Sequence, residues 1–362
     1  MGLLEKNGLF CIGVLLLAGE WAHAKEKQRL FESPRNYGRG GAYVAASDSD
    51  EASKFNPATI SEADVTFQLR WAELDIFFAE KGVNQISKLA SSTTSNFLEE
   101  TGDLFKGTNI NGRGQLSLFS MRIGGFELSP FFLGRGFADL RNPSLPDVDY
   151  EADGIVGTNI VYSFALSKAM SIGVTMRPLY RWYLAGEAGV TDLLDTSNLS
   201  DLATVVSGGG LGLDVGMIWT PAKTFRLGAT VQNVGDTEYF QEFGSEPPPI
   251  QQTINTGMLY RMEMFGGDLD FLADLQGIVN RGGVNLLRLL HVGVEQGWSV
   301  FSRDHDYGIT CGLNEGYFGG GFFVDAWLAR LDFSSYGVEL GHYPGQRVDR
   351  RMSFTLRSSM TF

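Results

Sequence analysis

The sequence predicts an all-β fold, an antiparallel transmembrane β-barrel of about 14 strands. Three observations predict it: an N-terminal segment with the layout of a secretory signal peptide, many strand-length segments in which apolar and polar residues alternate, and a final alternating segment that ends on an aromatic residue. Alternation over the length of one bilayer crossing is what a barrel strand requires. A soluble β-sandwich with one face in water is the alternative that alternation alone leaves open.

The start of the chain carries the expected export signal. Lys6 lies in a short polar region, an apolar run extends from Gly8 to Gly19, and Ala22-His23-Ala24 offers small residues for a cleavage before Lys25. The apolar run is shorter than the roughly 20 residues that a membrane-spanning helix needs. We therefore expect residues 1–24 to be a signal peptide that directs Sec export.

Composition and charge disfavour several other classes of protein. The chain has 362 residues, 46 glycines, 26 phenylalanines and a formal net charge of −13 at pH 7. Nucleic acid is disfavoured as a partner because a protein that neutralises phosphates presents a basic face. A helical membrane protein is disfavoured because no uninterrupted apolar stretch of spanning length follows the signal segment. A barrel stays compatible with ordinary hydropathy, since its lipid-facing and lumen-facing residues alternate.

The last segment, residues 350–362, shows the alternation clearly. Phe354 and Leu356 share an apolar face, and Thr355 between them takes the polar face. A period of two over about 11 residues has the length of one tilted membrane-spanning strand. A C-terminal Phe362 on such a strand resembles the signal that the outer-membrane assembly machinery recognises, and we expect it to act as that signal.

The same rhythm recurs along the chain and predicts the remaining strands. The expected strands are residues 63–79, 112–122, 125–136, 151–166, 169–187, 208–220, 223–235, 250–263, 266–279, 286–297, 304–315, 317–332, 335–343 and 350–362. The tryptophans in or beside them are expected at the membrane interface, with a carbohydrate-stacking track as the alternative. They are Trp71, Trp182, Trp219, Trp298 and Trp327.

Three stretches interrupt the strand pattern. Residues 25–62 precede the first strand and are expected to form a separate N-terminal segment, so that the barrel itself occupies 63–362. Gly82 to Lys106 and Val190 to Val206 carry sparse apolar residues in a helix-like pattern, which indicates short helices. The long connections of such barrels lie outside the cell, so both stretches are expected to be extracellular loops.

The segment from Ser33 to Ile60 resembles the N-terminal region of FadL-like and PorV-like outer-membrane barrels. A Gly-rich turn (Gly38 to Gly41), an Ala-Tyr-Val-Ala stretch (Ala42 to Ala45) and the triplet Asn56-Pro57-Ala58 precede the first strand in that order. Gly312 to Phe322, near the other end, is similar to the PorV-like branch. The resemblance implies a barrel of about 14 strands whose N-terminal segment folds inward as a hatch that contains the triplet.

Motifs that would carry chemistry are weak, and we expect no enzyme, no cofactor and no metal ion. Asp149, Glu151 and Asp153 mimic the opening of a calcium loop, but Ile160 stands where a bidentate glutamate is needed. A solvated loop is the better interpretation there, with weak divalent-cation binding near lipopolysaccharide as the alternative. Gly38 to Gly41 follows no strand and lacks the third glycine of a dinucleotide loop.

The resemblance implies a conduit for small hydrophobic molecules as the first candidate function. In FadL-like proteins the ligand passes the hatch and leaves sideways through a kink in the third strand. Pro130 and Gly134 interrupt the third expected strand, and proline cannot donate a hydrogen bond to the ladder. We therefore expect a lateral opening at these residues, with a routine bulge as the alternative.

Arginines on the lumen face are the candidates for contact with a ligand. Arg70, Arg177, Arg181 and Arg226 fall on the polar side of their expected strands. Their guanidinium groups could hold the carboxylate head group of a hydrophobic ligand. The alternative is that they pair with acidic residues of the lumen.

A PorV-like scaffold or shuttle for a secreted protein is the alternative function. The likeness of the C-terminal part and the expected helical outer loops favour it. A general porin is disfavoured because an inward-folded N-terminus leaves little open channel. In either case we expect the protein in the outer membrane of a Gram-negative bacterium, inserted by the assembly machinery and surrounded by lipid and lipopolysaccharide.

Overall fold

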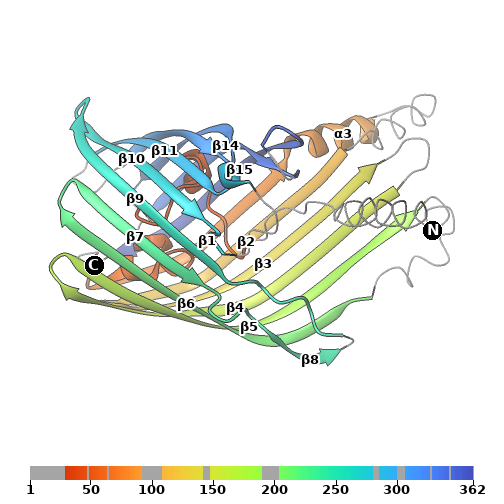
Figure 1. Cartoon of the computed structure of the whole chain (residues 1–362), viewed down its shortest axis with the longest axis horizontal. Coiled ribbons are helices and arrows are strands. Elements are labelled where there is room, and N and C mark those ends of the chain that lie inside the picture. Colours follow the sequence, from red (N-terminus) through yellow and green to blue (C-terminus); the bar gives the residue numbers. More distant parts are fainter. Residues whose placement is uncertain are drawn as a thin grey trace, which may run out of the picture.

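The computed structural model describes residues 29–46, 49–62, 65–91, 108–141, 147–189, 204–243, 245–279, 285–299, 306–326, 328–341 and 344–361. In these ranges the strands form one antiparallel sheet that closes on itself (Figure 1). The expected signal peptide and Phe362 lie outside the described residues, so their roles stay predictions.

The barrel wall has fourteen strand positions. The strands are β1 (Phe67–Ala79), β2 (Thr108–Ile123), β3 (Phe126–Arg141), β4 (Asp147–Ser167), β5 (Met170–Gly189), β6 (Val206–Ala222), β7 (Phe225–Gln232), β8 (Tyr239–Phe243), β9 (Thr253–Met264), β10 (Gly267–Gln276), β11 (Leu290–Trp298), β12 (Tyr307–Asn314), β13 (Tyr317–Ala326), β14 (Ala329–Glu339) and β15 (Val348–Thr361). Pairing of β1 with β15 closes the ring, and β7 and β8 both pair with β6 as two parts of one strand. The predicted antiparallel barrel of fourteen strands is confirmed.

Most strand ends differ by a few residues from the expected ones, and two differences change the connections. The seventh strand, expected to run unbroken over 223–235, ends at Gln232, and β8 begins after a gap of six residues. The connection between β13 and β14 follows Ala326, whereas the pattern placed it after residue 332. The sequence gives little warning of this second turn, because no glycine, asparagine or proline marks it.

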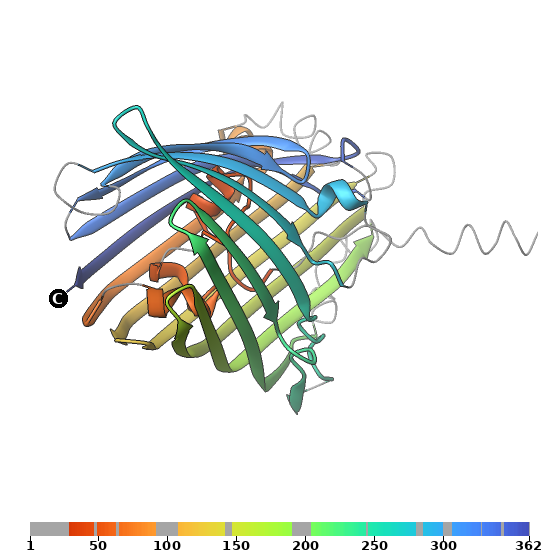
Figure 2. The ribbon, with the colours of Figure 1, turned by 60° about the vertical axis from the view of Figure 1, so that its left-hand side comes forward.

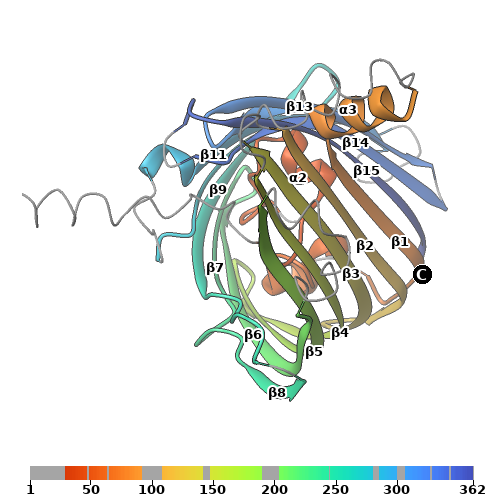
Figure 3. The ribbon, with the colours of Figure 1, turned by 90° about the vertical axis from the view of Figure 1, so that its right-hand side faces the viewer.

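One helix lies in a region where an outer loop was expected. It is α3 (Glu80–Ser91), which continues from β1 at the rim of the barrel (Figure 3). Residues 92–106 of that loop lie outside the described residues, and so do residues 190–203 of the second expected helical stretch, 190–206. Among the residues that are described, no helix is long and apolar enough to cross a membrane.

Apolar side chains point away from the barrel and polar side chains point into it. In β15, Phe354 and Leu356 are 46% and 52% exposed, whereas Thr355 and Arg357 are 2% and 1% exposed. The described tryptophans that stand exposed on the wall are Trp71, Trp182 and Trp219. This distribution is the inverse of that in a water-soluble sandwich, and it fits a wall that faces lipid outside and polar groups inside.

The lumen is filled by residues 29–46 and 49–62, which we call the plug (Figure 2). Its helices are α2 (Pro34–Gly38), η1 (Ser49–Glu51) and η2 (Pro57–Glu62). Ser33 caps α2 by accepting a 3.4 Å hydrogen bond from the Asn36 backbone N–H, and Pro34 suits the first helical position. Figure 3 shows α2 enclosed by the strands of the wall, so the N-terminal part of the chain lies inside the barrel.

Closure of the sheet has a consequence for electrophoresis. A closed barrel satisfies its backbone hydrogen bonds between neighbouring strands, so SDS alone should not unfold it. We expect unheated protein to migrate differently from boiled protein in SDS gels. Equal migration of the two samples, or recovery of the chain in the soluble periplasmic fraction, would contradict a closed membrane barrel.

Candidate functional site: a plugged lumen with an apolar wall

The plug lies on three pairs of glycines that face each other across adjacent strands. The pairs are Gly173 with Gly216, Gly228 with Gly257, and Gly293 with Gly312. A Cβ atom at Gly216 would lie 2.8 Å from Cδ of Pro57, and one at Gly228 would lie 2.8 Å from the carbonyl carbon of Val44. Glycine is therefore required at these positions for the backbone of the plug to approach the wall.

The triplet Asn56-Pro57-Ala58 lies within the lumen and joins the plug to itself and to the wall. Nδ2 of Asn56 donates to the Val44 carbonyl at 2.8 Å, and its Oδ1 accepts from the Ala58 backbone N–H at 3.1 Å. Oγ of Ser163 in β4 donates to the Ala58 carbonyl at 3.1 Å. The triplet thus holds a turn of the plug against the wall. Its role as a hatch stays a prediction.

A buried group of charges fixes the second half of the plug. Lys54 forms ion pairs with Glu73 and with Asp75 of β1, the latter at 2.8 Å. Arg357 of β15 lies 3.0 Å from Glu73 and 3.4 Å from Asp50 of the plug. We call these five residues the charge cluster. The plug supplies one cation and one anion to the charge cluster, and the wall supplies the other cation and two anions. Separation of the plug from the wall would therefore leave buried charges without partners on each side.

The first half of the plug is held by the opposite wall. The Asp274 carboxylate of β10 accepts hydrogen bonds from the backbone N–H groups of Tyr43 at 2.6 Å and Val44 at 2.9 Å. Arg35 and Arg39 both pair with Glu295 of β11. Hydrogen bonds to charged groups contribute about 1.5–3 kcal/mol each, so these contacts add substantially to docking.

The contributions of Asp50 and Lys54 to docking of the plug should change only in strong acid or strong base. Burial disfavours the charged forms of Asp50 and Lys54, but opposite charges outweigh it: Arg357 holds the pKa of Asp50 at about 2, and Asp75 with Glu73 raises the pKa of Lys54. The contribution of Asp50 is complete above its unfolded pKa of about 3.9 and is lost as pH falls through about 2. That of Lys54 is complete below about 10.4 and is lost as pH rises through its folded value.

We therefore expect hydrogen exchange of the amides around Asp50 and Lys54, corrected for the intrinsic pH dependence, to stay slow from about pH 4 to about pH 10. Exchange should accelerate only in stronger acid or base. A loss of protection between about pH 5 and pH 8 would show that other groups control docking.

The lumen wall carries an apolar surface where alternation would place polar residues. Phe131, Leu133, Ile155 and Leu179, from β3, β4 and β5, point inward and are at most 6% exposed. We call these four residues the lumen patch. Phe31 of the plug packs against Phe131 edge to face, with ring centroids 5.0 Å apart. The plug therefore covers an apolar surface that would otherwise face the pore.

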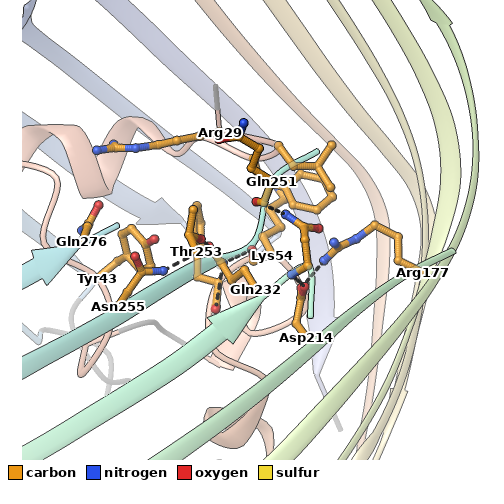
Figure 4. A pocket seen from close by; sticks show the side chains of 14 residues that line it. Arg29, Tyr43, Lys54, Arg177, Asp214, Gln232, Gln251, Thr253, Asn255 and Gln276 are labelled. Carbon is orange, nitrogen blue, oxygen red and sulfur yellow. Dashed lines mark hydrogen bonds and ion pairs between the residues drawn. The ribbon is translucent and has the colours of Figure 1, made fainter. Parts of the chain in front are cut away.

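Two small cavities lie between the plug and the wall in the described part of the chain. A cavity of about 30 Å³ opens among Tyr43 and Phe55 of the plug and Arg177, Asp214 and Gln251 of the barrel (Figure 4). A second cavity, of about 20 Å³, adjoins the lumen patch. A water needs about 10–15 Å³ by this measure, so the first cavity has room for about two or three water molecules and the second for about one or two. Passage of a larger molecule through either cavity would require the plug to move.

The four arginines expected in the lumen each pair with a carboxylate. The pairs are Arg70 with Glu73 at 3.3 Å, Arg177 with Asp214 at 2.5 Å, Arg181 with Asp153 at 2.7 Å and Arg226 with Glu62 at 2.5 Å. The first three arginines are at most 2% exposed. These ion pairs correspond to the alternative role of the four arginines, which is pairing with acidic residues of the lumen. Contact of any of the arginines with a ligand stays a prediction.

The region of Pro130 contains a bulge in the neighbouring strand. The register between β3 and β4 runs continuously through the pair Pro130 and Thr158. Between β2 and β3 the register shifts between Ser117 and Met121, where Phe119 has a φ of 53°. Gly134 is paired in regular register with Gly114 of β2 and with Gly154 of β4. A lateral opening at Pro130 or Gly134 stays a prediction.

The acidic pattern at Asp149, Glu151 and Asp153 does not form the solvated loop that was expected. These residues lie within β4, and Glu151 and Asp153 face arginines of the wall. Extended backbone keeps such side chains two residues apart on one face, which explains the spacing without a metal. Among the described residues, no group of three or more His, Cys, Asp or Glu side chains is placed to hold a metal ion.

The lumen patch and the glycine pairs were missed in the sequence. Phe131-Phe132-Leu133 is an unbroken apolar run, so period two does not say which of its residues face inward. The glycines were visible, but the sequence does not show that two of them lie opposite each other on neighbouring strands. The signal in the sequence was that apolar residues occupy positions of β3, β4 and β5 where alternation predicts polar ones.

Comparison with known proteins found similar folds among solved structures. No protein-family model matches the chain, and no curated protein matches it significantly. Among solved structures, the toluene transporter TodX of Pseudomonas putida has a TM-score of 0.54 and 9% identity, over 94% of this chain and 100% of that one. The toluene transporter TbuX of Ralstonia pickettii has a TM-score of 0.53 and 10% identity, over 91% and 98%. The monoaromatic hydrocarbon channel CymD has a TM-score of 0.52 and 9% identity, over 91% and 97%.

These likenesses extend over nearly the whole length of both chains, although the identities are too low to transfer function. In this chain the closed barrel, with residues 29–46 and 49–62 inside it, agrees with what the segment from Ser33 to Ile60 implied. The chain has the fold of a FadL-like outer-membrane β-barrel.

Proposed function

We propose that the protein is an outer-membrane channel for small, uncharged hydrophobic molecules, closed by its plug. The lumen patch carries the proposal, because apolar side chains of β3, β4 and β5 face inward where a water-filled pore would carry polar ones. An apolar molecule that reaches this surface gains about 25 cal/mol per Å² of apolar area removed from water. The likeness in fold to proteins described as toluene transporters and hydrocarbon channels supports the same class of substrate.

The arginines beside the lumen patch favour an uncharged substrate over a carboxylate. Arg181 is paired with Asp153, and Arg177 with Asp214, so a ligand carboxylate would have to displace a buried partner. The guanidinium carbon of Arg177 also lies 5.0 Å from the ring centroid of Phe31. An aromatic ligand could take the place of Phe31 over this cation once the plug shifts.

The proposal includes the path of the protein to the membrane. Residues 1–24 would direct Sec export, 25–62 would form the hatch segment, and 63–362 would be inserted as the barrel by machinery that recognises Phe362. Asn56, Pro57 and Ala58 would hold the hatch closed until a ligand displaces it.

Uptake of radiolabelled toluene and benzoate tests the proposal in Gram-negative cells that lack their own hydrocarbon channels. The protein should raise uptake of toluene and leave that of benzoate unchanged. Leu133→Asn should lower toluene uptake about tenfold, since an unpaired amide in the lumen patch costs about 1–3 kcal/mol. Phe132→Leu is the matched control, because Phe132 faces outward on the same strand and is 50% exposed.

Equal toluene uptake with and without the protein would contradict the channel. Recovery of a secreted protein with the gently purified barrel, in the absence of uptake, would favour the PorV-like scaffold instead. Toluene uptake that is unaffected by Leu133→Asn would show that the lumen patch is not on the path.

A further inference from the structure

A row of inward-facing residues crosses five neighbouring strands, β3, β4, β5, β6 and β8 (Figure 3). Strand pairing sets the row, which consists of Phe131, Gly157, Leu179, Gly210 and Tyr239 in that order. Phe131 and Leu179 belong to the lumen patch, and Tyr239 packs in the same apolar cluster. Tyr239 therefore extends the lumen patch around the wall as far as β8.

The two glycines of the row make room for aromatic rings. A Cβ atom at Gly157 would lie 2.9 Å from Cζ of Phe131, and one at Gly210 would lie 2.9 Å from Cδ1 and 3.1 Å from Cε1 of Tyr239. Carbon atoms in ordinary contact are about 3.5–4.0 Å apart, so a larger residue at either position would displace a ring. The rings of Phe131 and Tyr239 thus lie over these glycines, on either side of Leu179.

The hydroxyl of Tyr239 lies at the edge of this apolar surface, and its proton has no acceptor. Tyr239 is 3% exposed, and its oxygen finds no acceptor among the described residues. The guanidinium carbon of Arg181 lies 5.7 Å from the Tyr239 ring centroid, but arginine carries only donors. Arg181 directs three of them to the two carboxylate oxygens of Asp153 and to the Pro248 carbonyl.

The plug does not satisfy this hydroxyl either. The plug residue that packs on Phe131 is Phe31, whose side chain has no polar atom. A buried hydroxyl without an acceptor destabilises the closed protein, and phenylalanine in place of Tyr239 would avoid that cost. A tyrosine at this position is explained if its O–H donates to a molecule that replaces Phe31 on the lumen patch when the plug shifts.

We propose that the lumen patch and Tyr239 form a binding subsite for an uncharged aromatic molecule that carries an oxygen acceptor, in an ether, carbonyl or hydroxyl group. The ring of the molecule lies on the apolar side chains, and its oxygen accepts the proton of Tyr239. A single polar group in an apolar pocket fixes the orientation of a ligand and discriminates against analogues that cannot pair with it. The inference rests on the channel function proposed above and narrows its substrate class, since oxygen-bearing aromatics are favoured over plain hydrocarbons.

Two molecules of the same shape test the subsite. Para-methylanisole and para-ethyltoluene differ only in an ether oxygen that replaces a methylene group, and this oxygen accepts a hydrogen bond but cannot donate one. The uptake of each is measured in radiolabelled form, and the ratio of ether to hydrocarbon is compared between variants. Tyr239→Phe removes the hydroxyl alone and should lower this ratio about fivefold, which corresponds to one hydrogen bond of about 1 kcal/mol.

Tyr260→Phe is the matched control. Tyr260 lies on the outward face of β9 and is 49% exposed, so its hydroxyl is outside the lumen and the ratio should equal that of the unmodified protein. Heat-modifiable migration in SDS gels shows that each variant has closed its barrel. Because Tyr239→Phe removes a hydroxyl that lacks an acceptor, it should leave the unfolding temperature unchanged or raise it.

The outcomes separate the subsite from the channel. An unchanged ratio in Tyr239→Phe, with toluene still taken up, would overturn the subsite and leave the channel intact. Failure of the unmodified protein to raise the uptake of toluene and of both test molecules would overturn both proposals. A lower unfolding temperature of Tyr239→Phe, or an equal fall of the ratio in Tyr260→Phe, would also overturn the subsite, because the hydroxyl would then be paired in the closed protein or its effect would not be specific to the lumen.

Discussion

Replacing Gly216 with valine is expected to force the plug out of its docked position. The new Cβ would lie 2.8 Å from Cδ of Pro57 and would also collide with Asn56. The opposing Gly173 faces the backbone of the same turn, so the plug cannot shift toward it. Overpacking of this kind costs about 1–3 kcal/mol or more. We expect faster hydrogen exchange in residues 49–62 and higher ion conductance in planar bilayers.

The matched control for this change is Gly114→Val. A Cβ atom at Gly114, in β2, would meet nothing within 4 Å, so valine should be accepted there. The control should keep slow plug exchange and low conductance. If Gly216→Val behaves like the control, the close fit between plug and glycine pair does not hold the lumen shut.

Replacing Lys54 with methionine is expected to weaken docking by about 3–5 kcal/mol, because it leaves the buried Asp75 carboxylate without its cation. Lys54 is 3% exposed and bridges Glu73 and Asp75; of these two carboxylates, Glu73 also pairs with Arg357. The free energy of plug opening, taken from native-state hydrogen exchange, measures the effect. Methionine is similar in length to lysine, so loss of charge rather than loss of volume should dominate.

Two variants make the interpretation of Lys54→Met specific. Lys223→Met removes the charge of an exposed lysine in the turn between β6 and β7 and should change stability by less than about 0.5 kcal/mol. Adding Asp75→Asn to Lys54→Met should recover part of the loss, because it removes the carboxylate that loses its cation. A Lys54→Met protein as stable as Lys223→Met would show that the charge cluster does not anchor the plug.

Alternation in the sequence was sufficient to predict the barrel because lipid and lumen make opposite demands on successive residues. Phe354 and Thr355 show the point: neighbours in the chain, they end on opposite sides of the wall. The same argument placed Arg70, Arg177 and Arg181 in the lumen, since a guanidinium group cannot face lipid cheaply. It failed at the seventh strand, because the expected strand ran on to residue 235 although Asn233 and Gly235 are residues that favour a turn.

By itself, the sequence determined the class of fold, the approximate number of strands and which face of most strands meets lipid, because these follow from the period of local polarity. Only the tertiary structure decided that Gly173 lies opposite Gly216, that Lys54 reaches Glu73, and that the break after Gln232 opens onto the plug. These are contacts between separate segments, set by strand register and by the path of the plug. Local polarity does not specify which distant residue lies opposite, and so the site emerged only when the barrel closed around its own N-terminal segment.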